Sequence, residues 1–236
     1  MDTRYKKMLI KQLEEEIEAA KKTDTEELAK QIRNIGFQCI MCGKCCRRGS
    51  GDNRVAVVPE EIRKICDGTG MKWDEIAEPL NIETDSPEEE HRLQAESGMI
   101  DEEGNIHTFG WMLRRKKNRD CSFIPDETAD NRCKIYEHRP LLCSTYPFYM
   151  EGLELQVSEC EGLGREISEQ DSKMLAEMVL ERYIRELQDT ILTYQNYTGF
   201  RTGEKGVKTA MSGLKQGYLN YIVHYSEGTN KITRKI

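Results

Sequence analysis

The chain has 236 residues, of which 33% are charged and 37% hydrophobic, and its formal net charge at pH 7 is -7. A chain of this length can bury a hydrophobic core without covalent cross-links, and its acidic balance argues against nucleic acid as a partner. The first 22 residues are charged throughout, and no run approaches the roughly 18 apolar residues of a membrane span. We therefore expect a cytoplasmic protein with no membrane segment.

Two helices are predicted in the N-terminal part of the chain. Apolar residues recur at steps of four between residues 4 and 22, which places them in one stripe on an otherwise charged helix. Thr23 and Glu26 have the spacing of a capping box for a second helix, and Gly36 is suited to end it.

The centre of the chain predicts short elements. The segment "RVAVVPEEIRKIC" reads as a β-branched strand followed by a helix that starts at Pro59, and residues 73–80 predict another helix. The acidic stretch 83–103 predicts a solvated loop or weak helix outside the core. "NIHTFGWML" has the composition of a strand, and the segment 121–160 predicts loops with short strands such as "LELQV".

Two helices are predicted near the C-terminus. Ser168 can cap a helix whose apolar residues repeat at three to four positions as far as Tyr194. Between residues 207 and 225 the apolar positions alternate steps of four and three, as in a heptad seam. Gly213 and Gly217 inside this final helix each cost about 1 kcal/mol relative to Ala, so the helix must depend on packing.

The predicted fold class is therefore α+β, mainly α, with a cysteine-rich core of loops and short strands between helices. The predicted division is an N-terminal helical arm at 1–35, a cysteine-cluster metal-binding domain at 36–162 and C-terminal helices at 163–236.

Clustered cysteines are the strongest chemical signal. Of nine cysteines, four lie within eight residues in the stretch "FQCIMCGKCCRRGS". Cytoplasmic thiols stay reduced, and soft thiolates are the ligands that select zinc, iron–sulfur clusters or cuprous copper. Cys66 stands apart on a predicted helix. The predicted metal ligands are Cys39, Cys42, Cys45, Cys46, Cys121, Cys133, Cys143 and Cys160.

The spacing of the first three ligands favours an iron–sulfur cluster. C-x2-C-x2-C is the pattern that offers three thiolates to a [4Fe–4S] cluster, whereas zinc sites usually show separate C-x2-C pairs. Zinc remains the alternative. Eight cysteines can form two sites of four, one centre of higher nuclearity, or one cluster with spare thiols. In an extended segment Cys45 and Cys46 point to opposite sides, which predicts that they face two centres or that one of them is packed.

Basic residues flank these cysteines. Four thiolates on a divalent metal or an oxidised [4Fe–4S] cluster leave a net charge of about -2, which is costly in a low-dielectric site unless cations offset it. Candidates for this role are Lys44, Arg47, Arg48, His138 and Arg139.

Three stretches together resemble a known family. "FQCIMCGKCC", "CSFIPDETADNRCKIYEHRPLLCSTYPF" and "SECEGLG" are similar to the CxxCxxCC-type, YkgJ-like cysteine cluster proteins, described as zinc- or iron-chelating. The resemblance covers about residues 36–162 and implies metal binding through the eight cysteines, without Cys66. Ser144 and Thr145 stand where relatives place a basic residue, and "CEGLG" replaces the family's frequent Cys-Pro-Gly. A similar segment accompanies methyl transfer to protein lysines in flagellin lysine methylases.

These observations lead to three functional hypotheses. The first is a protein with one or two iron–sulfur clusters that acts in electron transfer or as an accessory to a larger enzyme, with a protein as its partner. The second is a structural zinc module for protein–protein interaction. The third is a component of a protein-modifying enzyme, although the chain has no GxGxxG turn of the kind that nucleotide-derived cofactors use. Enzymatic activity and catalytic residues are left open.

Overall fold

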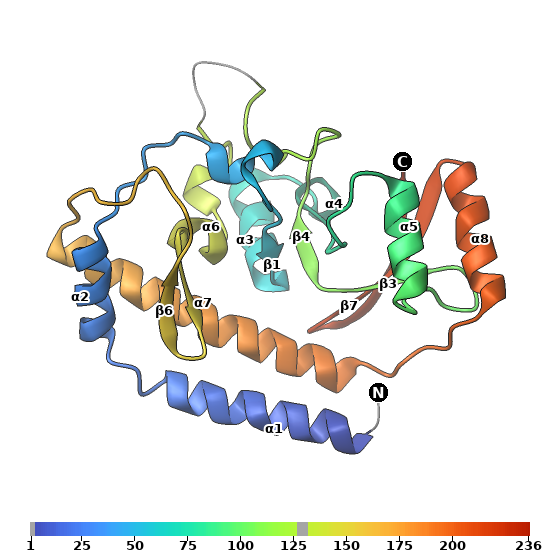
Figure 1. Ribbon diagram of the computed structural model, residues 1–236, viewed down its shortest axis with the longest axis horizontal. Coiled ribbons are helices and arrows are strands. Elements are labelled where there is room, and N and C mark those ends of the chain that lie inside the picture. The colour runs from blue at the N-terminus through green and yellow to red at the C-terminus, as the bar shows by residue number, and fades with distance from the viewer. Residues whose placement is uncertain (1–2, 127–131) are drawn as a thin grey trace.

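The computed structural model describes residues 3–126 and 132–236. Its longest helix, α7 (Glu169–Asn196), packs against two others: α1 (Thr3–Ala20) runs alongside it, and α2 (Thr25–Ile35) crosses it near its N-terminal end (Figure 1). Asp24 caps α2 by accepting the Glu26 N–H at 2.9 Å, so the cap lies one residue after the predicted Thr23. Both N-terminal helices thus form where the sequence predicts them.

A small antiparallel sheet lies at the centre of the molecule. Its strand order is β1 (Ala56–Val57), β4 (Trp111–Leu113) and β2 (Ala77–Pro79). Helix α3 (Pro59–Thr69) follows β1 as predicted, because Pro59 fixes the first helical turn. Helix α4 (Trp73–Ile76) is shorter than predicted, since the chain turns into β2 to pair with β4.

A second sheet corrects the prediction of a final helix. Helix α8 (Glu204–Lys215) ends early, and the chain continues as β7 (Tyr218–Tyr225) and β8 (Gly228–Lys235). Strand β7 pairs in parallel with β3 (Ile106–Phe109) and antiparallel with β8. The side chains of β7 alternate mainly between buried and half-buried positions, so the period is two, and its tyrosines and β-branched residues suit a strand. The apparent heptad was a coincidence of spacing across the α8–β7 turn.

The pairing of β3 with β7 buries two histidines. His107 Nδ1 lies 2.7 Å from His224 Nε2, and His107 Nε2 lies 3.2 Å from a carboxylate oxygen of Asp101. An ionised Asp101 only accepts, so His107 donates to it and in turn accepts from His224. The remaining ring nitrogen of His224, Nδ1, is buried and has no hydrogen-bond partner within the described residues.

The acidic stretch 83–103 also differs from its prediction. It contains α5 (Pro87–Glu96), which packs against α8 and has a polar buried face. Glu90 accepts a 2.7 Å hydrogen bond from the Tyr221 hydroxyl, and His91 contacts the Val207 carbonyl at 3.1 Å. Because hydrogen-bonded polar groups replace apolar ones on this face, hydrophobic periodicity could not reveal a core helix.

Short elements complete the chain between residues 44 and 157. They are the 3-10 turns η1 (Lys44–Cys46), η2 (Arg48–Ser50) and η3 (Tyr136–His138), helix α6 (Leu141–Thr145), and strands β5 (Phe148–Glu151) and β6 (Glu154–Val157). Strands β5 and β6 form a hairpin that includes the segment "LELQV", where a strand is predicted. The predicted α+β, mainly α, fold class is confirmed.

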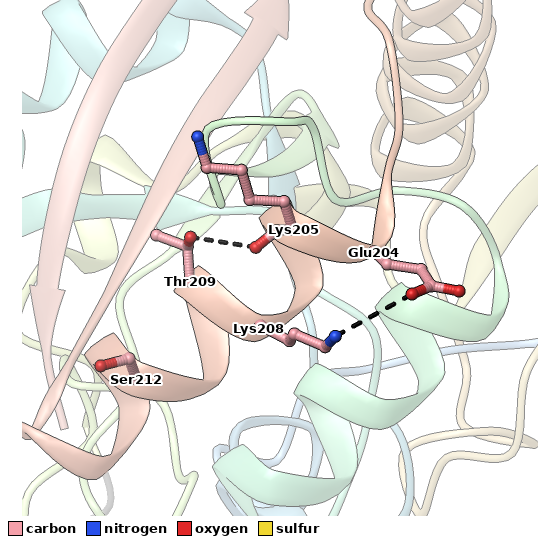
Figure 2. Close-up of a pocket in the computed structure, with 5 residues that line it drawn as sticks. All are labelled: Glu204, Lys205, Lys208, Thr209 and Ser212. Carbon is pink, nitrogen blue, oxygen red and sulfur yellow. Dashed lines mark hydrogen bonds and ion pairs between the residues drawn. The ribbon is translucent and has the colours of Figure 1, made fainter.

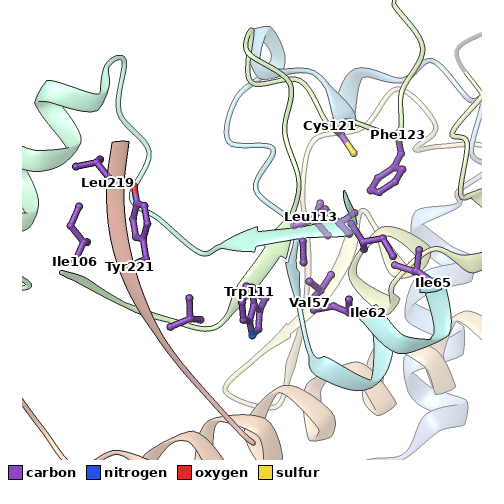
Figure 3. Packing of buried hydrophobic residues seen from close by; sticks show 14 of the residues in the cluster. Val57, Ile62, Ile65, Ile106, Trp111, Leu113, Cys121, Phe123, Leu219 and Tyr221 are labelled. Carbon is purple, nitrogen blue, oxygen red and sulfur yellow. The ribbon is translucent and has the colours of Figure 1, made fainter. Parts of the chain in front are cut away.

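Two hydrophobic clusters hold these elements together. The larger one joins the central sheet, α3 and the β3–β7 pair, and Figure 3 shows Trp111, Ile62 and Tyr221 within it. Cys121 belongs to the same cluster and lies above Leu113 (Figure 3). The other cluster joins α2 and α7 to the β5–β6 hairpin. The thiol-bearing segments therefore lie beside two packed cores.

The outer face of α8 carries a shallow hollow of about 600 Å³ lined by polar side chains (Figure 2). Thr209 donates to the Lys205 carbonyl at 3.0 Å, and Lys208 lies 3.9 Å from Glu204. These contacts are internal to one helix, so the hollow is a solvated helix face.

No helix in the described parts of the chain combines the length and apolar character needed to cross a bilayer.

Candidate metal centre

All eight predicted ligands line one pocket. The pocket has a volume of about 1100 Å³, and its walls are formed by residues 37–55, residues 133–146 and residues 159–178, with Cys121 on its inner side. Cys66, which the sequence places outside the set, is not among the lining residues and packs against the larger core. The fold thus brings together thiols that lie more than a hundred residues apart.

The cysteine loop starts at a tight junction between two segments. The Gln38 N–H donates to the Gly162 carbonyl at 3.0 Å, and the Gly164 N–H donates to the Gly36 carbonyl at 3.0 Å. A Cβ on Gly162 would lie 2.3 Å from the Gln38 carbonyl oxygen, so only glycine permits this approach. The junction places Cys160 next to the start of the cysteine loop.

Two buried polar residues fix the other end of the loop. Asn53 donates to the carbonyls of Cys46 and Arg119 at 3.1 and 2.9 Å, and the Cys121 N–H donates to the Cys46 carbonyl at 2.8 Å. Asp120 accepts the Arg48 N–H at 2.9 Å. Sequence reasoning missed Asn53 and Asp120, because an isolated polar residue gives no signal until its burial is known.

A buried carboxylate holds the helix that carries Cys143. Glu61 accepts the Leu141 N–H at 2.7 Å and the Val58 N–H at 3.1 Å, which joins the starts of α6 and α3. Burial raises the pKa of Glu61, and these two backbone donors oppose the shift. Glu61 is a further positioning residue that sequence reasoning did not identify.

The adjacent pair differs from its prediction. Cys45 and Cys46 lie in the 3-10 turn η1, and their Sγ atoms are 3.9 Å apart. Successive side chains in a 3-10 helix are about 120° apart, whereas those of a strand are opposed. The prediction that the two thiols point to opposite sides is therefore wrong, because the segment is not extended.

Backbone contacts and mutual electrostatic effects divide the thiols into two neighbourhoods: the Gln38–Gly162 hydrogen bond brings Cys160 to the start of the cysteine loop, and the Cys121 N–H donates to the Cys46 carbonyl. Burial raises the pKa of Cys160, and Cys42, Cys45 and Cys39 raise it further. Burial likewise raises the pKa of Cys143 well above its usual value, with added contributions from Cys46, Cys45 and Cys133. A hydrogen bond with Cys121 is the largest cause that raises the pKa of Cys46, to about 12. We call Cys39, Cys42, Cys45 and Cys160 the outer group, and Cys46, Cys121, Cys133 and Cys143 the inner group.

Cys45 is the thiol that connects the two groups. It influences Cys160 in the outer group and both Cys133 and Cys143 in the inner group. Its own pKa is raised, first by its hydrogen bond with Cys46 and then by burial.

The basic residues near the pocket have different roles. Arg139 stacks over the Tyr136 ring at 3.7 Å, and its charge favours the thiolate forms of Cys45, Cys133 and Cys143. Lys44 is ion-paired with Glu161. Arg47 also lines the pocket and pairs with Asp120. Arg48 and His138 do not line it: Arg48 pairs with Glu83, and His138 lies against Gly68.

The donor set fits zinc or iron, because the pocket presents thiols and the soft thiolate binds both. Within residues 3–126 and 132–236, no three His, Cys, Asp or Glu side chains are gathered closely enough to hold a single metal ion. The thiols therefore share a pocket without converging on one point.

Comparison with protein families gives one match. Residues 38–162, more than half of the chain, match the family model CxxCxxCC, with the description "Putative zinc- or iron-chelating domain". The chain belongs to the CxxCxxCC family. No curated protein and no solved structure gave a significant match.

Membership of the CxxCxxCC family agrees with the resemblance drawn from the cysteine stretches and supports metal binding by this segment. The matched range includes all eight cysteines of the pocket and ends two residues after Cys160. The description names zinc and iron alike, so the choice of metal depends on the arrangement of the thiols.

Proposed function

We propose that the chain is a cytoplasmic iron–sulfur protein that acts in electron transfer or as an accessory to a larger enzyme. The observation that carries the proposal is that all eight cysteines of the CxxCxxCC segment line one pocket. A bound cluster would supply one-electron redox chemistry. The protein supplies the thiolates, with Arg139 as positive charge beside three of them.

We propose the outer and inner groups as two ligand sets of four. The first three cysteines of C-x2-C-x2-C fall in the outer group, and the junction at Gly162 brings Cys160 to them as the fourth. The inner group draws its members from four separate segments of the chain. Cys160 and Cys143, which belong to one group each, are therefore the positions at which mutation separates the two sets.

The C-x2-C-x2-C spacing along the chain supports a cluster, because it offers three thiolates that can each bind a different iron. Around a tetrahedral zinc with Zn–S bonds of about 2.3 Å, sulfur atoms stand about 3.8 Å apart. In a [4Fe–4S] cluster each thiolate binds a different iron, so the four sulfurs stand farther apart.

Zinc is the second candidate, and the adjacent pair is the observation that favours it. The Sγ atoms of Cys45 and Cys46 are 3.9 Å apart, close to the spacing of two ligands on one zinc ion. Stoichiometric zinc that does not change with oxygen exposure would select a structural zinc module in place of a redox protein.

The test is metal analysis of the full chain purified without oxygen. We expect a brown protein with about four iron and four sulfide per occupied group, and an electron paramagnetic resonance signal after reduction. Cys160→Ala and Cys143→Ala should each remove the cluster of one group and retain the other. Cys66→Ala is the matched control and should retain all the iron. Colourless, iron-free protein would overturn the proposal.

A further inference from the structure

The mouth of the cysteine pocket exposes large apolar side chains. Ile40, Met41 and Met174 line the pocket and have exposed fractions of 39%, 47% and 54%. Met41 lies between two outer-group cysteines with a φ of +53°, a left-handed conformation that costs a residue with a Cβ about 1–2 kcal/mol. The cysteine loop holds Met41 in this conformation although about half of its side chain is exposed to solvent.

One face of α7 continues the apolar surface. Met174 and Met178 stand one helical turn apart on α7 and both line the pocket, Met174 exposed and Met178 half-buried, whereas Leu175 between them is buried in the core cluster of α2 and α7. Methionine side chains are flexible and polarisable, so they adapt to the shape of a binding partner. The rim is therefore suited to contact another macromolecule.

The same wall is acidic. Glu159 and Glu166 line the pocket, and their carboxylates form no hydrogen bond or ion pair within the described parts of the chain. Asp171 adds a third carboxylate, which accepts from the Ser168 hydroxyl at 2.7 Å. The nearby Lys44 is already neutralised by Glu161. The pocket is also lined by Arg47 and Arg54, which pair with Asp120 and Asp52, and by Arg139, which lies over the Tyr136 ring, so the carboxylates of residues 159–171 favour a partner with positive charge.

We propose that this surface docks a basic, apolar segment of a partner protein over the outer group of cysteines. Apolar side chains of the segment contact the methionines, and its Lys or Arg side chains pair with the carboxylates of residues 159–171. The acidic wall repels nucleic acid and anionic membranes, which distinguishes a protein partner from both. The docking surface is formed by side chains at the mouth of the pocket, so it is the same whichever metal the cysteines bind.

The direct test uses a labelled model peptide of about 18 residues, five helical turns, composed of Lys and Leu in an amphipathic pattern. A second peptide with Glu in place of Lys is its control. Binding is measured by fluorescence anisotropy on the full chain purified without oxygen. We expect the Lys peptide to bind and the Glu peptide not to bind. Affinity for the Lys peptide should fall at least about tenfold as salt screens the carboxylates.

Three variants assign the surface. Met174→Gln and Glu166→Lys should each weaken binding of the Lys peptide about tenfold. Met8→Gln is the matched control, because Met8 is 47% exposed on α1 and does not line the pocket. All three positions are on the surface, and circular dichroism checks that each variant is folded.

The outcomes separate this inference from the iron–sulfur proposal, because iron is measured on the same samples. Unchanged binding by Met174→Gln and Glu166→Lys, or equal weakening by Met8→Gln, would overturn the docking surface whatever the iron content. Binding of a single-stranded DNA probe at this surface would also overturn it. Iron-free protein that binds the peptide through Met174 would overturn the cluster and leave the docking surface intact.

Discussion

Acidification is expected to destabilise the protein through the buried histidine pair of β3 and β7. Burial and, to a smaller extent, the neighbouring His107 together lower the pKa of His224 from its usual value of about 6.5 to about 4. The pKa of His107 is also lowered by burial, although Asp101 opposes the shift. In the folded protein both rings are therefore uncharged at neutral pH, and each has a lower proton affinity than in the unfolded chain.

The sign and size follow from linkage. Between pH 6.5 and 4 the unfolded chain binds more protons at His224 than the folded chain does, so stability rises with pH in this window. The contribution is complete above about pH 6.5 and is lost as pH falls through about 4. A shift from 6.5 to about 4 corresponds to about 3 kcal/mol, because each pKa unit is worth about 1.4 kcal/mol.

Urea denaturation under reducing conditions at a series of pH values measures the contribution of His224 to the free energy of unfolding. His224→Phe keeps a ring beside Phe109 and Tyr197 but removes the titrating group, so its stability should fall less steeply than that of the wild type. His138→Gln, a change at an exposed histidine, is the matched control. Parallel pH profiles for the wild type and His224→Phe would refute the reasoning.

Three further predictions concern the pocket. Glu61→Gln should lower the free energy of unfolding by about 1–3 kcal/mol and weaken metal binding by the inner group, because the Leu141 N–H at the start of α6 loses a charged acceptor. Urea denaturation and iron content measure the two effects, and Glu60→Gln, at an exposed position, is the control. Gly162→Ala should cost about 1–3 kcal/mol, since the new Cβ would overlap the Gln38 carbonyl, whereas Gly49→Ala meets no atom within 4 Å and should be tolerated. Chelation of the metal without oxygen should lower the melting temperature by roughly 6–12 °C, if binding contributes about 3 kcal/mol; an unchanged melting temperature would contradict coupling between metal and fold.

The cysteine site was largely predictable because its signal is local. Four thiols in eight residues mark a ligand loop on their own, and the scattered cysteines stand in a segment rich in Pro, Tyr and Gly. The structure places all eight on one pocket and Cys66 elsewhere. The conformation at Cys45 and Cys46 could not be inferred in the same way, because a cysteine pattern does not specify whether the chain is extended or turned.

The misassigned elements share a physical cause. Strand β7 places Tyr218, Tyr221 and Tyr225 at intervals of three and four, which match one face of a helix, and the pairing of β7 with β3 and β8 selects the strand instead. Helix α5 buries Glu90, whose partner Tyr221 lies 131 residues away. Long-range partners such as these cannot be deduced from the local pattern.

The larger core has a consequence for how the protein folds. The CxxCxxCC match ends at residue 162, yet Leu214, Leu219 and Tyr221 belong to the same cluster as Ile62 and Trp111. The β3–β7 ladder closes a loop of more than a hundred residues, so a large loop-closure entropy must be overcome before the sheet stabilises the core. On a ribosome, the ligand segment emerges well before the strand that completes its sheet. A chain released at residue 162 would expose to solvent the part of the core that Leu214, Leu219 and Tyr221 cover.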